Sequence, residues 1–166
     1  MWVVVQYNRH EEDLFKNEMK LKFGQETRFY SPKAIVTKII NNSFKKVEKK
    51  LINNYLLCFN EKFKDKNFLN IIRTIKGLNN MLAGSLYNQK NILDFLHFCK
   101  KNEDLNGFLK FDFFKENITK NKDTFFSKIF PNLNYKLINE KKSFSFFING
   151  KLVRVKNKPN IVFNPI

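Results

Sequence analysis

The spacing of apolar residues over the first hundred positions switches repeatedly between the period of a strand and the period of a helix. Trp2–Tyr7 (WVVVQY) is a β-branched and aromatic run that is typical of a buried strand. Acidic residues at 11–13 then favour a helix start. The spacing of Leu14, Phe15, Met19 and Phe23 predicts one apolar helix stripe, and Gly24 predicts the helix end.

Further along this part of the chain, the pattern predicts alternating short strands and helices. Tyr55–Phe59 reads as a central strand, and Ala34–Ile40 is expected to pair with Phe44–Val47 across a polar turn. The other elements expected are a short strand at Thr27–Ser31, a helix at Asn67–Ile75 ended by Gly77, a strand with turns at Leu78–Leu86, and a helix at Asn91–Lys101 with Ile92, Leu93, Phe95, Leu96, Phe98 and Cys99 inward. This order predicts an α+β fold with a mostly antiparallel sheet and flanking helices.

After residue 104 the pattern changes to short alternating strands separated by turn residues. Asn149-Gly150 is the strongest hairpin signal in the chain. The strands expected are Phe125–Phe130, Lys136–Ile138, Ser143–Ile148, Lys151–Val155 and Ile161–Phe163. Such a series predicts a small β-barrel. We therefore expect one domain at 1–103, a linker at 104–117 and a second domain at 118–166.

The composition of the 166 residues adds a strong positive charge. Lys and Arg number 31 against 15 Asp and Glu, which gives +16, and hydrophobic residues at 43% exclude a fully disordered chain. A polyanionic partner is favoured. However, Lys (27) and Asn (24) are both enriched, which is typical of the codon bias of an AT-rich genome. Part of the positive charge can therefore reflect codon bias and not function. No apolar run approaches the about 20 residues of a membrane helix, and no leader opens the chain, so we expect a cytoplasmic protein without a membrane partner.

Motifs for catalysis are missing from the sequence. There is no phosphate-binding glycine loop, no H-E-x-x-H and no C-x-x-C. We interpret His10 and His97 as surface or capping residues. Cys58 and Cys99 fit a strand and a helix core better than a nucleophile or a metal ligand. The expectation is a protein that is not an enzyme and needs no cofactor or metal.

Four segments in order give the first domain a resemblance to the NusG family of transcription elongation factors and its RfaH-like paralogues. They are Trp2–Tyr7, Tyr30-Ser31-Pro32, Leu51–Phe59 (LINNYLLCF) and Ile72–Leu78 (IRTIKGL). The resemblance implies an NGN-type domain over 1–103. Residues 137–163 resemble the second half of the small KOW β-barrel that follows in this family, although the family's G-D-x-V-x-V opening is missing. Some relatives hold this second domain as a helical hairpin, and both forms remain open.

The resemblance implies a function and a set of partners. The first domain would bind the clamp helices of the RNA polymerase β′ subunit, bridge the cleft to the β subunit, and suppress pausing or termination. The implied apolar patch maps onto Leu51, Ile52, Tyr55 and Leu57, of which Leu57 fits a core position equally well. The family also implies a ribosomal protein or the Rho factor as partner of the second domain, and we expect a monomer.

The resemblance further implies contact with upstream or non-template DNA. The matching basic positions are Arg9 and Lys76, with Arg73 one helical turn before Lys76. The guanidinium group of Arg binds phosphates and base edges with two parallel hydrogen bonds, which Lys cannot do. Each of the three residues fits a solvated surface charge equally well.

Two other classes of function fit the same sequence. One is a basic RNA-binding module, ribosome-associated or generic, in which strand aromatics such as Phe144, Phe146 and Phe147 stack on bases. The other is a structural or interaction protein whose charge reflects codon bias alone. Steeply salt-dependent binding to bare RNA would favour the first, and no nucleic-acid affinity would favour the second.

Overall fold

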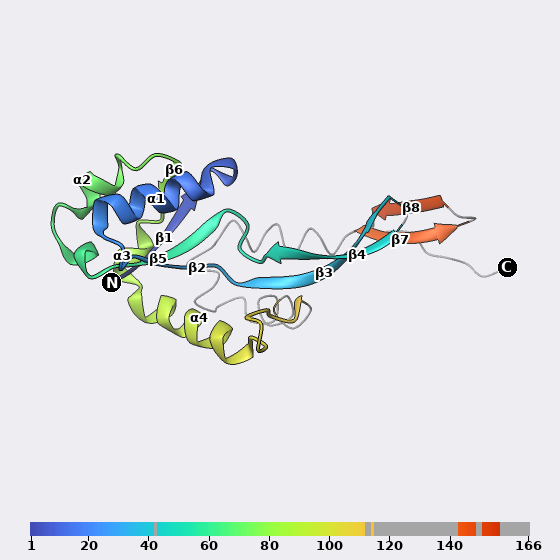
Figure 1. Cartoon of the computed structure of the whole chain (residues 1–166). Coiled ribbons are helices and arrows are strands. Elements are labelled where there is room, and N and C mark those ends of the chain that lie inside the picture. The colour runs from blue at the N-terminus through green and yellow to red at the C-terminus, as the bar shows by residue number, and fades with distance from the viewer. Residues whose placement is uncertain (42, 112–113, 115–142, 149–150, 157–166) are drawn as a thin grey trace.

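A computed structural model describes residues 1–41, 43–111, 114, 143–148 and 151–156 of the chain. Within these ranges the fold is a mixture of helices and antiparallel strands, as the sequence predicts (Figure 1). In chain order the elements are β1 (Trp2–Tyr7), α1 (Glu12–Phe23), β2 (Arg28–Tyr30), β3 (Lys33–Ile40), β4 (Ser43–Lys50), β5 (Tyr55–Phe59), α2 (Phe68–Ile72), β6 (Leu78–Met81), α3 (Gly84–Tyr87), α4 (Gln89–Asn102), β7 (Ser143–Ile148) and β8 (Lys151–Lys156).

The centre of the fold is a four-stranded antiparallel sheet in the order β2-β5-β1-β6. Strand β1 lies inside it, with Val4 opposite Leu57 on β5 and Gln6 opposite Asn80 on β6. The predicted central position of Tyr55–Phe59 is confirmed, because β5 pairs with β1 on one side and β2 on the other. Both inner strands are rich in residues that suit a sheet covered on both faces.

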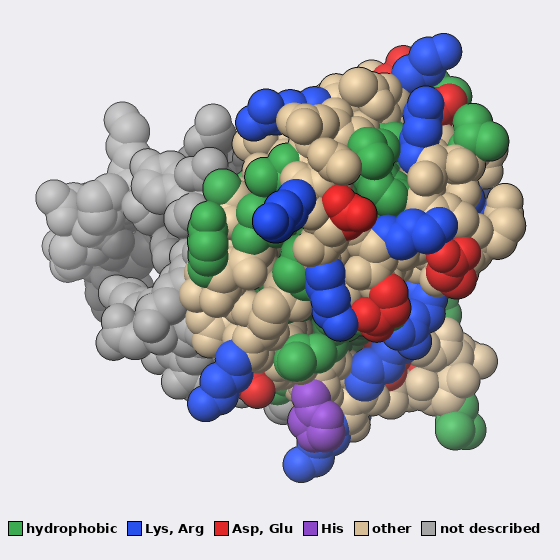
Figure 2. All heavy atoms as spheres, turned by 90° about the vertical axis from the view of Figure 1, so that its left-hand side faces the viewer, with side chains coloured by type: hydrophobic (Ala, Val, Ile, Leu, Met, Phe, Trp, Pro, Cys, Tyr) green, Lys and Arg blue, Asp and Glu red, His purple; other side chains and the backbone are tan. Residues whose placement is uncertain are grey.

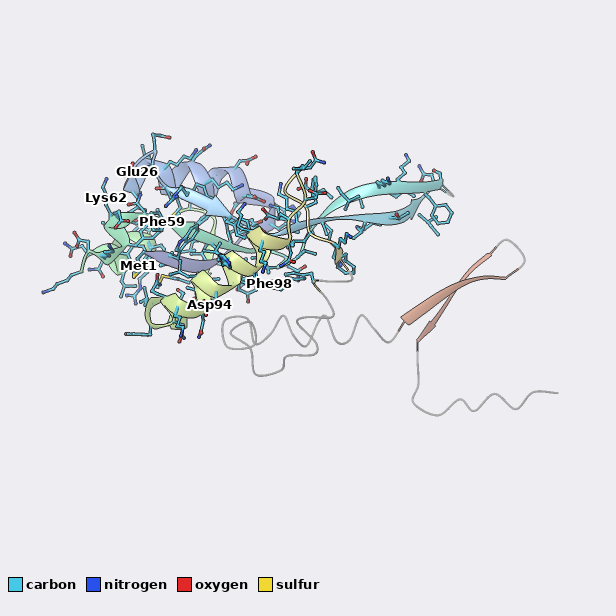
Figure 3. All side chains as sticks on the ribbon, turned by 90° about the horizontal axis from the view of Figure 1, so that it is seen from below. Met1, Glu26, Phe59, Lys62, Asp94 and Phe98 are labelled. Atoms are coloured by element: carbon cyan, nitrogen blue, oxygen red, sulfur yellow. The ribbon has the colours of Figure 1, made fainter. Side chains whose placement is uncertain are left out.

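Helices cover the two faces of this sheet and divide the apolar residues into two clusters. Alternation along β1 sends Val3 and Val5 to the face covered by α1 and α2, and Val4 to the face covered by α4. Figure 3 labels Asp94 and Phe98 on α4, which runs along the face opposite α1. The α1 cluster includes Phe15, Met19, Phe23, Phe63, Phe68 and Ile72, and the α4 cluster includes Leu57, Ile92, Phe95, Leu96 and Cys99.

The two long helices follow the predicted apolar spacing, except that one residue predicted for the apolar stripe of each helix is exposed. In α1 the residues Phe15, Met19 and Phe23 are buried, but Leu14 is 43% exposed. In α4 the residue Leu93 is 52% exposed, although it was expected to point inward. Leu14 directly precedes the buried Phe15 and Leu93 directly follows the buried Ile92. Each is about 100° around the helix axis from that neighbour, and the covered face is too narrow to include it. Gly24 ends α1 at φ +110, as predicted.

Two predicted elements are shorter than their sequence pattern. The helix expected at Asn67–Ile75 is confined to Phe68–Ile72, and the chain continues through turns to Gly77. The strand expected over Leu78–Leu86 ends at Met81, after which the chain forms the one-turn helix α3. The bulge between Gln6 and Tyr7 in the β1–β6 ladder accompanies this short pairing.

The predicted hairpin of β3 and β4 forms, and it is longer than expected. Eight residues of each strand pair in continuous register, from Lys33 opposite Lys50 to Ile40 opposite Ser43. These two strands make a sheet of their own and project away from the four-stranded sheet (Figures 1 and 3). We call this hairpin the β3–β4 arm.

The second predicted hairpin is also present. Strands β7 and β8 pair from Ser143 opposite Lys156 to Ile148 opposite Lys151. The strands expected at 125–130, 136–138 and 161–163 lie outside the described residues, so the β-barrel stays a prediction. No helix in the described part of the chain is long and apolar enough to cross a bilayer.

Candidate functional site

The three basic residues expected to face DNA are all exposed. A backbone hydrogen bond from Asn8 N to Gly77 O, at 2.8 Å, joins the end of β1 to the turn before β6. It places Arg9 and Lys76 at one end of the sheet, and Arg73 follows α2 in the same turn region. Among the described residues none of the three has a carboxylate within ion-pair distance. This end of the sheet lies beside the turn at the base of β4, since Tyr7 N donates to Asn54 O at 3.0 Å. Figure 2 shows the opposite end of the molecule, where Lys and Arg side chains are interspersed with acidic ones.

The sharp turn that sets this geometry depends on Gly77. Its φ is +77, a left-handed value that glycine adopts without strain. An added Cβ would lie 3.1 Å from Phe15 Cβ and 3.2 Å from the carbonyl oxygen of Glu11. The glycine predicted as a helix stop therefore also permits close approach of the β6 turn to the start of α1.

Next to Arg9, a partly buried carboxylate forms a hydrogen-bonded node that sequence reasoning missed. Glu12 accepts hydrogen bonds from Lys16 (2.7 Å), from the Tyr7 hydroxyl (2.8 Å) and from Lys50. Burial alone raises the pKa of the Glu12 carboxyl, but these three donors outweigh burial and hold it at about 2. Burial and the bond to Glu12 raise the pKa of Tyr7. The node fixes the base of the β3–β4 arm to α1, because Lys50 ends β4.

The apolar residues expected to bind polymerase lie mostly inside the fold. Leu51 (3% exposed), Ile52 (0%) and Leu57 (0%) belong to the α4 cluster, and Tyr55 alone is half-buried. Leu57 lies on β5 and points into the core, as the sequence analysis allowed for this residue. Leu51 and Ile52 form the turn after β4, and the left-handed φ of +52 at Asn53 directs the chain back into β5. The expected patch is thus not an open surface in this conformation.

Residues of the segment predicted as a linker are buried in the same cluster as Leu51 and Ile52. Leu109 and Phe114, 2% and 0% exposed, belong to the same cluster as Leu51 and Ile52. Leu109 N donates to Lys33 O at 2.8 Å, and Glu103 pairs with Leu109 as an isolated bridge. We call residues 103–111 together with Phe114 the covering segment. The domain boundaries stay a prediction, but this part of 104–117 packs on the first domain.

A pocket of about 810 Å³ opens between the start of α1, the end of β2 and the covering segment. Tyr30, on its wall, donates from its hydroxyl to Glu103 Oε1 at 2.6 Å. Burial first, and interactions with Cys99 and Glu103 next, raise the pKa of Tyr30. Ser31 Oγ is the one buried side-chain polar atom without a hydrogen-bond partner among the described residues. The charged lining residues are of both signs, and this mixture specifies no ligand.

The two cysteines are buried on opposite faces of the sheet. Cys58 lies in the α1 cluster and Cys99 in the α4 cluster, both as free thiols. Burial raises the pKa of Cys58, and it raises the pKa of Cys99 to about 12 although a hydrogen bond with Tyr30 lowers it. Neither thiol is poised as a nucleophile. Within the described ranges, no group of three or more His, Cys, Asp or Glu side chains is arranged to hold a metal ion.

Comparison with known proteins adds no assignment. No protein-family model matches the chain, and no curated protein matches its sequence significantly.

Proposed function

We propose that the protein is a transcription elongation or antitermination factor of the NusG and RfaH type. In this proposal its first domain binds the β′ clamp helices of RNA polymerase, bridges to the β subunit and suppresses pausing or termination. The NGN-type description of the first domain and the KOW-like barrel of the second are parts of the same proposal. RNA polymerase and upstream or non-template DNA are the partners it names.

One observation carries the proposal. The four segments of the resemblance are far apart in sequence, yet each contributes to a strand of the same four-stranded sheet. Trp2–Tyr7 is β1, Tyr30 ends β2, Tyr55–Phe59 is β5, and Ile72–Leu78 leads into β6. Two of the segments contain a whole strand, and the other two overlap β2 and β6 by one residue each, Tyr30 and Leu78. Their convergence therefore supports a common origin for the pattern.

The buried patch adds a condition to the proposal. Leu51 and Ile52 are buried in the α4 cluster, so polymerase can reach them only after part of this cluster moves, and we assign this movement to the covering segment. Tyr55 is accessible without such a change, and it packs at the edge of the same cluster. We therefore assign the first contact to Tyr55, with Leu51 and Ile52 contributing apolar area once they are uncovered. Burying each aliphatic side chain against polymerase would then return the about 1.5–3 kcal/mol that uncovering it costs.

Co-migration with core RNA polymerase from the host, in size-exclusion chromatography at moderate salt, tests the polymerase contact. The informative variant is Tyr55→Ala, with Tyr87→Ala as matched control because Tyr87 is 86% exposed on α3. Ile52→Ala is unsuitable, since truncating a fully buried residue costs about 2–5 kcal/mol of stability. Co-migration of the wild type and of Tyr87→Ala, but not of Tyr55→Ala, is expected. Absence of wild-type co-migration would reject the proposal.

Crosslinking in an elongation complex tests the DNA contact. Replacing Arg9, Arg73 and Lys76 together with Ala should reduce crosslinking to upstream or non-template DNA. A control that removes the same charge elsewhere replaces Lys22, Lys90 and Lys101, which are exposed on α1 and α4. Equal crosslinking by the two triple variants would reject the assignment of these three residues.

A further inference from the structure

The β3–β4 arm has a base held by the body of the protein and a tip held by nothing else that the structure describes. At the base, Lys50 bonds to Glu12, Leu109 N donates to Lys33 O at 2.8 Å, and Lys49 lies over the ring of Phe111 at 4.6 Å. Eight residues per strand give an arm about 27 Å long at ~3.4 Å per residue. Both views of the ribbon show its outer half standing clear of the four-stranded sheet (Figures 1 and 3).

Large apolar side chains are exposed at the tip. Phe44 is 76% exposed and lies opposite Ile39, which is 38% exposed, and the adjacent Ile40 is also 38% exposed. A two-stranded hairpin in water is marginally stable on its own. A hairpin tip that keeps an aromatic ring in solvent forgoes the burial that would stabilise it, and this indicates that the ring is buried by a partner.

Positive charge at the tip lacks counter-ions. Lys38 and Lys45 lie directly opposite each other, an arrangement of like charges that destabilises a strand pair. Together with Lys46 they have no carboxylate within ion-pair distance among the described residues, whereas Lys33 and Lys50 at the base do. The arm from Lys33 to Lys50 has six Lys and one Glu, a net charge of +5. The partner must therefore be anionic as well as able to bury a ring.

The register distributes these groups over both faces of the ribbon. Directly opposed residues share a face and successive residues alternate, so Lys38 and Lys45 lie on one face while Lys46 lies on the other beside Phe44. A lipid surface would meet one face or the end of the ribbon. A nucleic-acid groove has a phosphate backbone on each side, and the major groove of B-form DNA admits a two-stranded ribbon. Phe and Ile are the side chains that proteins wedge against base steps.

We propose that the β3–β4 arm is a ribbon that binds duplex DNA in a groove. Lys38 and Lys45 on one face, and Lys46 on the other, neutralise phosphates on the two sides of the groove. Phe44 packs against the bases at the tip. This surface is separate from Arg9, Arg73 and Lys76, and its binding to DNA does not depend on polymerase.

Fluorescence anisotropy with the full chain and a labelled duplex of mixed sequence, without polymerase, measures the contribution of the lysines. Replacing Lys38, Lys45 and Lys46 with Ala should lower the slope of log affinity against log salt by about 2.7, since each phosphate contact contributes about 0.9. Replacing Lys22, Lys90 and Lys101 with Ala removes the same charge outside the arm, and this control should change the slope by less than one. Equal slopes for the two variants would overturn the proposal.

A second reporter isolates the wedge. A 2-aminopurine base in the duplex brightens when its stack is disturbed, so wild-type protein should raise its emission and Phe44→Ala should not. Loss of the ring should also weaken affinity about fivefold or more, the range for base–aromatic stacking. Phe44 is exposed, so the variant should keep the wild-type circular dichroism spectrum and melting temperature.

Three other results would overturn the proposal. They are unchanged 2-aminopurine emission with the wild type, equal or tighter binding to single-stranded RNA, and a preference for anionic vesicles that Phe44→Ala abolishes. Because polymerase is absent, a failed polymerase assay leaves this result untouched. If the arm binds duplex DNA while the protein does not co-migrate with polymerase, the elongation-factor proposal fails and the arm stands.

Discussion

Removing the Phe114 side chain should open the covering segment without unfolding the protein. Phe114 is fully buried in the α4 cluster and belongs to a segment fixed to β3 by the backbone bond from Leu109 to Lys33. Truncation of a buried Phe to Ala costs about 3–5 kcal/mol. We expect this loss to destabilise the closed position of the covering segment alone. A loss of about 3 kcal/mol then raises the population of the open segment about 100-fold, because about 1.4 kcal/mol changes an equilibrium constant tenfold.

The two buried cysteines make this prediction measurable. Cys99 shares the α4 cluster with Phe114, whereas Cys58 lies on the other face of the sheet. Both thiols are protonated at pH 8 because burial raises their pKa values, so alkylation proceeds through open states. The native protein is labelled with an alkylating reagent, and the modification of each cysteine is quantified by mass spectrometry. Phe114→Ala should raise the alkylation rate of Cys99 about 100-fold and change the alkylation rate of Cys58 little.

A control and a contradictory result complete the test. Leu105→Ala lies in the same segment at a fully exposed position and should leave both rates unchanged. Equal acceleration of Cys58 and Cys99 by Phe114→Ala would mean that the covering segment unfolds only with the whole domain. This result would refute the inference that the covering segment can leave Leu51 and Ile52 while the rest of the domain stays folded.

Three further predictions concern the residues that hold the site together. Glu12 has a pKa of about 2 against an ordinary value of 4.5, so its carboxylate stabilises the fold fully above pH 4.5 and loses that effect as the pH falls toward 2. The shift corresponds to about 3 kcal/mol, and solvent screening reduces this value. We expect the difference in the free energy of unfolding between wild type and Glu12→Gln, measured by urea denaturation, to shrink by about 1–2 kcal/mol from pH 7 to pH 3. A difference that stays constant with pH would contradict this. Gly77→Ala should lower the free energy of unfolding by about 1–3 kcal/mol because of its left-handed φ and the contact with Phe15, and an unchanged melting temperature would count against it. Asn60 is buried and donates to Thr27 Oγ1 at 2.9 Å, so Asn60→Leu should cost about 1–3 kcal/mol in urea melts, and equal stability would show that this bond is dispensable.

Much of the first domain could be predicted from local sequence because its signals are strong and short-range. The β-branched run of Trp2–Tyr7, the stripe of Phe15, Met19 and Phe23, and the stop at Gly24 each specify structure within a few residues. The pairing of β3 with β4 follows from a polar turn between two alternating segments. Leu14 and Leu93 were misassigned because apolar character alone does not say how wide the covered face is.

The candidate site was harder to predict because its features depend on contacts between distant parts of the chain. Leu51 and Ile52 are apolar whether they lie on a binding surface or in the core. Their burial depends on a cluster that includes α4 and, about 60 residues later in the chain, Leu109 and Phe114. The node at Glu12 likewise needs Lys50, 38 positions away. Arg9, Arg73 and Lys76 are exposed, and their contact with DNA stays a prediction.

A site-specific crosslink from position 55 in a transcription elongation complex tests the proposed polymerase contact directly. Replacing Tyr55 with benzoylphenylalanine places a photoreactive ring where the first polymerase contact is proposed, and the same replacement of Tyr87 provides the control. Position 55 should crosslink to the clamp helices of the β′ subunit, and position 87 should not. No crosslink to polymerase from position 55, or equal crosslinking from both positions, would contradict it.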